Sequence, residues 1–395
     1  MLTKQQFNIT MMSMKRGIEI INRRILLLLV FVCTSCTFAK IVWHGFANID
    51  DFEIFPARYL RAGGDVFRFN DRRSESNFPT TVSIAQYHNE PLDRVLAYND
   101  TVAFIVIKNS DLLYERYFQG FDRSTQSISF SMSKSFLSIL IGCAIDDGII
   151  KSVDQPITDF VPELKENGFD RVKIEHLLQM TSGLDYEDGN NPFGMHPRFY
   201  YGDNLEQMML DFELAQEPGQ EFTYKSGENE LLGLVLSRAL RDRTITDYTQ
   251  QKLWTPLGME FDGAWNLDRE GGLEKTFCCL SGRAIDFVKI GLMFLNGGRF
   301  NGKTIVSEEW VKRSTMIDTS QGSSWKYQYQ WWMVSKNSRD FMASGHKGQI
   351  LYVMPSRSMV FVRLGQSRGG FTTGEWQELF REIAENLRDN GGKNL

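Results

Sequence analysis

The pattern of apolar and polar residues is clearest between residues 101 and 148. Two apolar stretches, TVAFIVIKN and LLYERYF, predict strands that are joined as a hairpin at Asn109-Ser110-Asp111. Residues Ser131 to Asp147 then form a helix-length apolar run, and Gly148 supplies its stop signal. Because this run is apolar around nearly its whole circumference, we expect a helix that the protein encloses on every side.

The rest of the chain changes from a helical middle to strands near the C-terminus. The pattern predicts helices in KIEHLLQMTSG, ENELLGLVLSRALRD and RAIDFVKIGLMFLNGG. Beyond residue 325 it predicts strands in YQYQWWMV, DFMASG, QILYVMP and MVFVRLG, and then an amphipathic helix over Glu375 to Arg388. The chain shows no internal repeat.

These elements indicate an α+β fold. We expect both strand groups to form one antiparallel sheet flanked by helices, with a mostly helical lobe inserted at about residues 150–325. The bilobal unit spans residues 96–390, and residues 44–95 are a polar lead-in without clear periodicity. The cleft between two such lobes is where we expect a functional site.

The N-terminus has the pattern of an export segment. An apolar run at residues 25–39, ILLLLVFVCTSCTFA, follows a basic flank made of Lys15, Arg16, Arg23 and Arg24. This order is typical of secretory signals and signal anchors. We expect residues 1–43 to be a cytoplasmic tail and a signal or anchor segment, with the remaining chain exported to the periplasm and held at the membrane.

The five cysteines and five histidines predict neither a disulfide framework nor a metal site. Cys36 is a weak candidate for lipid attachment, because Cys33 stands where a lipoprotein signal usually has leucine. Cys143 falls within a helix, and the adjacent Cys278 and Cys279 are awkward partners for each other. The histidines lack ligand-like spacing. We therefore expect no metal and no cofactor.

The charge pattern argues against nucleic-acid binding, and the flanking elements of one phosphate-loop match argue against a nucleotide site. The chain has 44 basic and 49 acidic residues, a net charge of −5, and no basic stripe interleaved with aromatic residues. GGRFNGKT, at Gly297–Thr304, fits G-x-x-x-x-G-K-T, but a helix precedes it where that motif needs a strand. We expect a turn between helices here.

A serine and a lysine at the start of the apolar helix suggest catalysis. Ser-x-x-Lys occurs at Ser131/Lys134, Ser323/Lys326 and Ser344/Lys347. Only the first pair opens a long helix, where residues three apart share a face and the helix N-terminus can stabilise an oxyanion. Burial among apolar neighbours lowers the pKa of Lys134, which prepares its amine to accept the serine proton.

Three motifs together resemble a known superfamily. G-x-S-x-G is absent, and no histidine–aspartate pair indicates a triad. SMSK, YKSGEN (Tyr224–Asn229) and GHKGQ (Gly345–Gln349) resemble the serine β-lactamases and penicillin-binding proteins. The class C-like branch, with its esterases and 6-aminohexanoate-dimer hydrolases, is most similar, and HLLQMTSGL and EPGQEFTYKSGENELLGLVLSRAL resemble it too. The resemblance covers roughly residues 95–390.

The resemblance implies roles for four polar residues. Ser131 would be the acylated nucleophile and Lys134 its base partner. Tyr224 would pass a proton to the leaving group, and Ser226 matches the third position of the tyrosine motif. Without the other motifs, Tyr224 would be interpreted as an ordinary half-buried loop tyrosine.

The third motif departs from the family pattern in an informative way. His346, Lys347 and Gly348 stand where penicillin-recognising members have Lys-Thr-Gly, and the backbone N–H of Gln349 would be the second oxyanion donor, alongside that of Ser131. A histidine is mostly neutral near pH 7, so a permanent cation for a substrate carboxylate is missing. Neighbouring strand residues face opposite ways, so Lys347 cannot share the pocket with His346. An ordinary strand-end histidine bonded to backbone is the alternative for His346.

We therefore expect a serine hydrolase that cleaves a small-molecule ester or amide through an acyl-enzyme on Ser131. A β-lactamase or D,D-peptidase is the alternative within enzymes. A catalytically idle binding or assembly protein of the same fold is the alternative outside them. The aromatic loop Gly189–Asp203 offers Tyr200 and Tyr201 as candidates for substrate contact. Pocket loops decide the natural substrate, and none indicates it from sequence.

Overall fold

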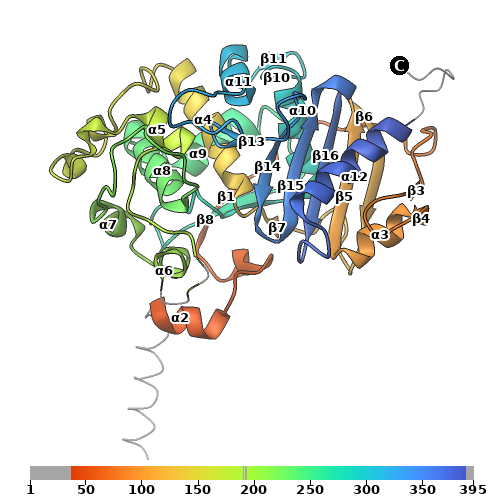
Figure 1. Ribbon diagram of the computed structural model, residues 1–395, viewed down its shortest axis with the longest axis horizontal. Coiled ribbons are helices and arrows are strands. Elements are labelled where there is room, and N and C mark those ends of the chain that lie inside the picture. Colours follow the sequence, from red (N-terminus) through yellow and green to blue (C-terminus); the bar gives the residue numbers. More distant parts are fainter. Residues whose placement is uncertain (1–36, 190, 192–193, 388–395) are drawn as a thin grey trace, which may run out of the picture. The chain divides into compact units, whose positions relative to one another are not determined.

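The computed structural model describes residues 37–189, 191 and 194–387. The chain divides into two compact units. One consists of residues 1–47 and 189–203, and the other of residues 48–188 and 204–395. The larger unit contains the predicted α+β fold (Figure 1).

The larger unit is built on a sheet of eight strands, in which strand groups from both ends of the sequence meet. In spatial order the strands are β12 (Tyr327–Gln328), β13 (Trp331–Met333), β14 (Phe341–Gly345), β15 (Gln349–Met354), β16 (Met359–Gly365), β5 (Thr101–Lys108), β6 (Asp111–Tyr117) and β2 (Asn70–Asp71). β5 pairs antiparallel with β16, which confirms that both strand groups form one sheet. Only the short β2 is parallel to its neighbour, β6.

The alternation of side chains along these strands gives the sheet two apolar faces. Phe104 and Val106 of β5 pack in a core with helices α3 (Leu92–Tyr98) and α12 (Thr373–Asn386). Helix α10 (Ala284–Leu295) packs against β5, β15 and β16. It approaches so closely that a side chain at Gly291 would lie 2.5 Å from Val360. The sheet is therefore covered by helices, as predicted for this fold class (Figure 1).

A second, four-stranded sheet brings distant segments to the start of helix α4 (Met132–Asp146). Its order is β1 (Ala57–Leu60), β8 (Gly263–Asn266), β9 (Leu280–Gly282) and β7 (Ser127–Ile128). The pairing of β7 with β9 places the residues before α4 beside those around position 280. β1 and β2 come from the lead-in, in which the sequence pattern indicated no element. Their partners lie far along the chain, so local periodicity did not reveal them.

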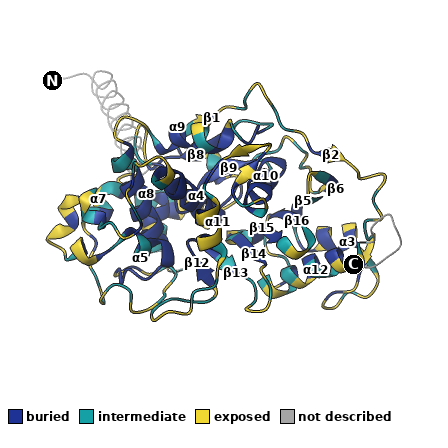
Figure 2. Cartoon of the chain, turned by 90° about the horizontal axis from the view of Figure 1, so that it is seen from above, coloured by how far each residue is buried: buried dark blue, intermediate teal, exposed yellow. Residues whose placement is uncertain are grey.

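Helix α4 is buried along almost its whole length, from Met132 to Ala144, as its apolar circumference predicted (Figure 2). It contacts α8 as well as β14 and β15. The other helices of the middle region are α5 (Ile174–Gln179), α7 (Leu205–Leu210), α8 (Ser226–Leu240), α9 (Ile245–Thr249) and α11 (Glu308–Thr315). A short hairpin, β3 (Thr81–Val82) with β4 (Glu90–Pro91), precedes α3.

The phosphate-loop match forms a tight hairpin between helices. β10 (Arg299–Phe300) and β11 (Lys303–Thr304) pair across Asn301 and Gly302, whose φ angles are 43° and 78°. Helix α10 precedes this hairpin and α11 follows it. Both neighbours are helices, as the sequence predicted, and the turn between them carries two short strands.

The smaller unit pairs helix α2 (Thr37–His44) with helix α6 (Met195–Tyr201). The ring of Tyr201 stacks on that of His44, and its hydroxyl donates to the carbonyl of Gly45. Most of the predicted anchor, residues 25–36, lies outside the described residues. Within the described part of the chain, no helix is both long enough and apolar enough to cross a membrane.

Candidate active site

Ser131 lies at the N-terminus of the buried helix α4. Phe130, just before it, has a φ of 47°, an uncommon conformation for a residue with a side chain. The Ser131 side chain makes no capping hydrogen bond, so the hydroxyl is not used to begin the helix. In the described part of the chain, no acceptor takes the Ser131 backbone N–H. The residue thus presents a hydroxyl and a backbone donor at the positive end of a helix.

Lys134 lies one turn further along α4 and is 1% exposed. Its Nζ lies 3.0 Å from Ser131 Oγ, 3.2 Å from Ser226 Oγ and 2.7 Å from the carbonyl oxygen of Phe277. Burial lowers the pKa of Lys134 to about 8, although nearby carboxylates act in the opposite direction. A lysine at this pKa can serve as a proton acceptor near neutral pH.

Tyr224 is placed over the same lysine, on the segment that leads into α8. The Lys134 ammonium lies 5.1 Å from the centroid of the Tyr224 ring. Burial raises the pKa of Tyr224, while a hydrogen bond with Ser131 acts in the opposite direction. The phenol is therefore protonated at neutral pH and can donate. Trp332 packs on the ring, with centroids 5.4 Å apart, and fixes its orientation.

Ser226 is the first residue of α8, and an acidic residue holds it. Oδ2 of Asp188 accepts from the Ser226 backbone N–H at 2.8 Å and from its hydroxyl at 3.1 Å. The hydroxyl in turn accepts from Lys134. The structure thus joins Asp188, Ser226, Lys134 and Ser131 in one hydrogen-bonded chain. The sequence offered no indication of Asp188, because it lies in a loop outside the three motifs.

The third motif forms a turn at the end of β14. A side chain at Gly345 would lie 2.4 Å from the carbonyl oxygen of Ser129, so β14 passes directly beside the residues that precede the nucleophile. The ring of His346 is exposed and meets the ring of Phe130 edge-on, with centroids 5.5 Å apart. His346 therefore lies at the rim of the site, next to the start of α4.

The turn departs from two expectations about this motif. The backbone N–H of Gln349, predicted as the second oxyanion donor, donates to the carbonyl of His346 within the turn. His346 and Lys347 are not neighbours on a continuous strand either, since Lys347 has a φ of 58° in the turn. The sequence pattern of DFMASG followed by QILYVMP did not reveal how tightly the chain reverses between them.

Comparisons with known proteins identify the family of the chain. A model of the beta-lactamase family matches residues 97–380, which is most of the chain. The chain belongs to the beta-lactamase family. Its sequence is 29% identical over 295 residues to a 6-aminohexanoate-dimer hydrolase of Paenarthrobacter ureafaciens, with 69% of this chain and 74% of that protein covered.

Several solved structures share the fold of this chain. A Bacillus anthracis protein assigned as a 6-aminohexanoate-dimer hydrolase superposes with a TM-score of 0.72 at 21% identity, covering 85% of this chain and 91% of that one. A family VIII carboxylesterase gives a TM-score of 0.59 at 14% identity, covering 75% and 95%. A class C beta-lactamase gives 0.55 at 16% identity, covering 76% and 95%. These confirm the resemblance and the fold class predicted from the sequence.

A buried arginine, Arg363, shapes the turn formed by residues 346–348. Sequence patterns did not single it out. Arg363 donates to the carbonyls of Lys347 at 3.0 Å and Gly348 at 2.8 Å, and it lies over the ring of Trp376. Gly348, predicted as a site residue, has a φ of 76°, and a side chain there would lie 2.3 Å from the guanidinium. Its role is to let the turn close around Arg363.

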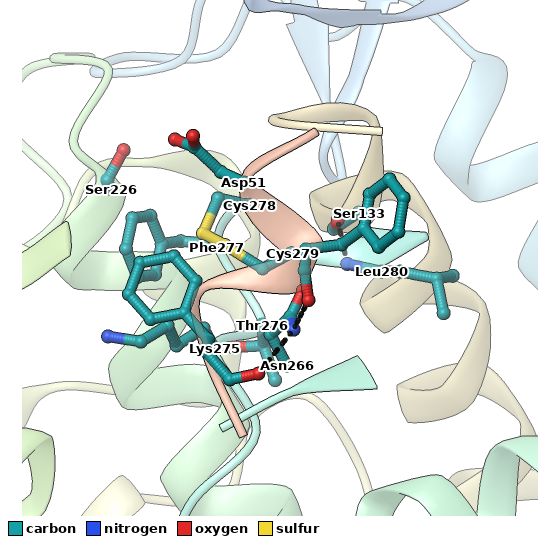
Figure 3. The surroundings of a disulfide bond; sticks show 12 residues. Asp51, Ser133, Ser226, Asn266, Lys275, Thr276, Phe277, Cys278, Cys279 and Leu280 are labelled. Atoms are coloured by element: carbon teal, nitrogen blue, oxygen red, sulfur yellow. Dashed lines mark hydrogen bonds between the residues drawn. A yellow bond between two sulfur atoms is a disulfide. The ribbon is translucent and has the colours of Figure 1, made fainter. Parts of the chain in front are cut away.

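The structure also corrects the account of the cysteines. Cys278 and Cys279 are joined by a disulfide, although adjacent cysteines are unusual partners. Both are buried, and they directly follow Phe277, the residue whose carbonyl binds Lys134 (Figure 3). Cys143 is a buried free cysteine, as its helical position suggested.

The predicted site residues therefore do not all lie together. Ser131, Lys134, Tyr224 and Ser226 come together around one ammonium group, and His346 lies beside them at the rim. Gly348 and Gln349 form the turn behind it. Tyr200 and Tyr201 are buried within the smaller unit, so their contact with a substrate stays a prediction.

Proposed function

We propose that the protein is a serine hydrolase that cleaves an ester or amide, as a carboxylesterase or a hydrolase of short amides or oligomers. The single observation that carries this proposal is the contact of 3.0 Å between Lys134 Nζ and Ser131 Oγ, with the lysine buried. A buried ammonium is costly unless a carboxylate compensates it, as Asp286 does for the buried Lys289. Lys134 instead bonds to two hydroxyls and a backbone carbonyl. A base that takes the serine proton needs this environment.

The hydrogen-bond inventory of Lys134 suits the role of base. An ammonium has three N–H donors, and the three acceptors around Nζ match them. The neutral amine keeps only two N–H groups. If Ser226 Oγ and the Phe277 carbonyl take these, the nitrogen lone pair points at the Ser131 hydroxyl, ready to accept its proton.

Acylation can then be written with every proton placed. Lys134 takes the hydroxyl proton of Ser131, and Oγ attacks the substrate carbonyl carbon. The backbone N–H of Ser131 and the N-terminus of α4 stabilise the oxyanion that forms. As the tetrahedral intermediate collapses, the C–O or C–N bond breaks and Tyr224 gives its proton to the leaving group, while the proton on Lys134 restores the phenol. In the second half of the reaction Lys134 takes a proton from water, and the water oxygen attacks the acyl carbon. The bond from that carbon to Ser131 Oγ then breaks, Oγ regains a proton from Lys134, and the acid is released.

Two observations favour esters and amides over β-lactams. The sequence relative that covers most of the chain is named for hydrolysis of an amide dimer, and a carboxylesterase shares the fold. His346 stands at the rim where penicillin-recognising members carry a lysine. The β-lactamase or D,D-peptidase remains the alternative within the family, and an idle binding protein the alternative outside enzymes.

A substrate panel tests the proposal. Wild-type protein and Ser131→Ala are compared on short-chain esters, short linear amides and a chromogenic cephalosporin. We expect ester or amide turnover in the wild type alone, well above cephalosporin turnover. Cephalosporin turnover comparable to that of the esters would favour a β-lactamase or D,D-peptidase over an esterase or amidase. No turnover of any substrate would favour the binding protein.

We also propose that the protein is exported and anchored at the membrane through its N-terminal segment. The basic flank and apolar run of residues 15–39 support this. Fractionation of cells expressing the full chain, compared with a chain that lacks residues 1–36, tests it. Recovery of both forms in the same soluble cytoplasmic fraction would contradict the proposal.

A further inference from the structure

The Cys278–Cys279 disulfide lies next to the group that orients the proposed base. Phe277, whose carbonyl accepts from Lys134 at 2.7 Å, is bonded directly to Cys278. Figure 3 shows the disulfide beside Phe277, with Ser133 and Ser226 among the residues drawn around it. No step of the proposed mechanism uses the two sulfur atoms, so their function needs a separate explanation.

The other end of the disulfide is tied to the same helix. Leu280 follows Cys279, and its backbone N–H donates to Ser133 Oγ at 3.1 Å. The carbonyl of Leu280 accepts from the backbone N–H of Ser129 at 2.9 Å. The short segment Phe277–Leu280 therefore contacts the start of α4 on both sides of the disulfide.

Further hydrogen bonds fix the backbone of the two cysteines themselves. The carbonyl of Lys275 accepts from both of their N–H groups, at 3.4 Å for Cys278 and 3.0 Å for Cys279. The carbonyl of Cys279 accepts from the N–H of Asn266 on β8, at 3.0 Å. The segment is thus held by the second sheet on one side and by α4 on the other.

A disulfide between neighbouring residues closes a small ring that contains their shared peptide bond. Because that peptide bond is planar, the backbone torsions inside the ring cannot rotate independently. Opening the ring would restore these rotations between the contact with Lys134 and the contact with Ser133. The Phe277 carbonyl would then hold the amine less firmly.

We propose that the Cys278–Cys279 disulfide is a positioning element of the active site, which stiffens the backbone so that the Phe277 carbonyl holds Lys134 in line with Ser131. This inference rests on the proposed function, in which Lys134 is the base. The protein is then fully active only with the disulfide closed. Opening it misplaces the base without removing any group that touches substrate.

The test compares the double variant Cys278→Ala/Cys279→Ala with the wild type and with Cys143→Ala. The control removes a buried free thiol from α4, away from the site. We expect kcat/KM of the double variant to fall roughly 10- to 100-fold, the loss typical of a slightly misplaced catalytic group. The acid limb of its pH profile should move to lower pH, because an ammonium with a weaker acceptor releases its proton more easily. Cys143→Ala should match the wild type.

A reduction experiment supplies the same comparison without mutation. Dithiothreitol gives two electrons and two protons, so the sulfur–sulfur bond breaks, two thiols form and the reagent closes to its own cyclic disulfide. Wild-type protein whose bond has been opened, as counted by alkylated thiols in mass spectrometry, should behave like the double variant. Removal of the reductant and reoxidation should restore activity. If melting curves show that the double variant is unfolded, this reduction experiment alone tests the role of the disulfide.

Two results would overturn the inference. One is an open-disulfide protein with the rate and pH profile of the closed form. The other is a lower rate with an unshifted acid limb, since that indicates general damage rather than a misplaced base. If the closed wild type itself turns over neither esters nor amides, the proposed function is at fault and not this inference.

Discussion

The hydroxyl of Ser226 lies 3.2 Å from the ammonium of Lys134, although 92 residues separate them in the sequence. Oδ2 of Asp188 accepts from the same hydroxyl at 3.1 Å, so the carboxylate reaches the base through one intervening side chain. This arrangement assigns Ser226 the task of turning the lysine toward Ser131. Asp188 in turn fixes the direction of the Ser226 hydroxyl.

Ser226→Ala is therefore expected to lower kcat/KM for esters by roughly 10- to 100-fold, because the amine loses one of the two acceptors that direct its lone pair. Steady-state kinetics checks this. Ser226→Thr keeps a hydroxyl and should retain more activity than the alanine variant. Equal activity of the alanine variant and the wild type would show that the hydroxyl does not orient the base.

The pH dependence follows from the state of Lys134. The amine accepts a proton only when neutral, and burial lowers its pKa to about 8. We expect kcat/KM to rise with pH and to level off above that value. Initial rates on an uncharged ester, measured in a series of buffers of different pH, give this profile of kcat/KM. An acid limb far below neutral pH, typical of a carboxylate, would assign the base to another group.

Replacing Lys134 should cost activity but raise stability. Its folded pKa is lowered from 10.5 to about 8, so between these values the unfolded chain binds more protons and stability rises with pH. Below that window the buried charge costs about 3 kcal/mol. Lys134→Met should therefore be inactive, yet melt at a higher temperature than the wild type at pH 7. A lower melting temperature would mean that the lysine contributes to stability.

The leaving group decides how much Tyr224 matters. Tyr224→Phe removes the proposed proton donor and keeps the ring that packs on Trp332. An amide nitrogen must be protonated to leave, whereas a nitrophenolate leaves without a proton. We expect kcat/KM to fall by roughly 100-fold or more for a short amide and far less for a nitrophenyl ester. Equal losses on both substrates would exclude this role.

Arg363 is expected to govern stability. Burial lowers its pKa to about 9, and it donates to the carbonyls of Lys347, Gly348, Asn99 and Ser367. Arg363→Met would leave these buried acceptors without a donor and should cost roughly 3 kcal/mol or more. Arg299→Met, at an exposed arginine, should change stability by less than about 0.5 kcal/mol. Denaturant unfolding gives the free energy of unfolding of both variants. Similar losses for the two would show that Arg363 has no special role in stability.

Local sequence patterns predicted much of this molecule. The apolar circumference of residues 131–147 predicted the buried helix, and the two apolar stretches within residues 101–118 predicted the central hairpin. Ser131 and Lys134 were identifiable because both lie on one helix turn, where spacing determines contact. Tyr224 and Ser226 needed the resemblance, because nothing local shows that α8 begins beside α4.

The residues that sequence patterns missed act through distant partners. Asp188 lies in a loop and gains its role only from Ser226. Arg363 looks like an ordinary strand residue until the turn at His346 closes around it. Within the same turn, the N–H of Gln349 donates to the carbonyl of His346. The pairing of Cys278 with Cys279 is local, but its proximity to Lys134 depends on β9 pairing with β7.

Trapping the acyl-enzyme shows whether Ser131 is the nucleophile. The wild type and Ser131→Ala are treated with a fluorophosphonate or a slowly hydrolysed ester, and the modified peptide is identified by mass spectrometry. We expect one adduct, on Ser131, which is absent from the variant. An adduct on another residue, or ester turnover that survives Ser131→Ala, would contradict it.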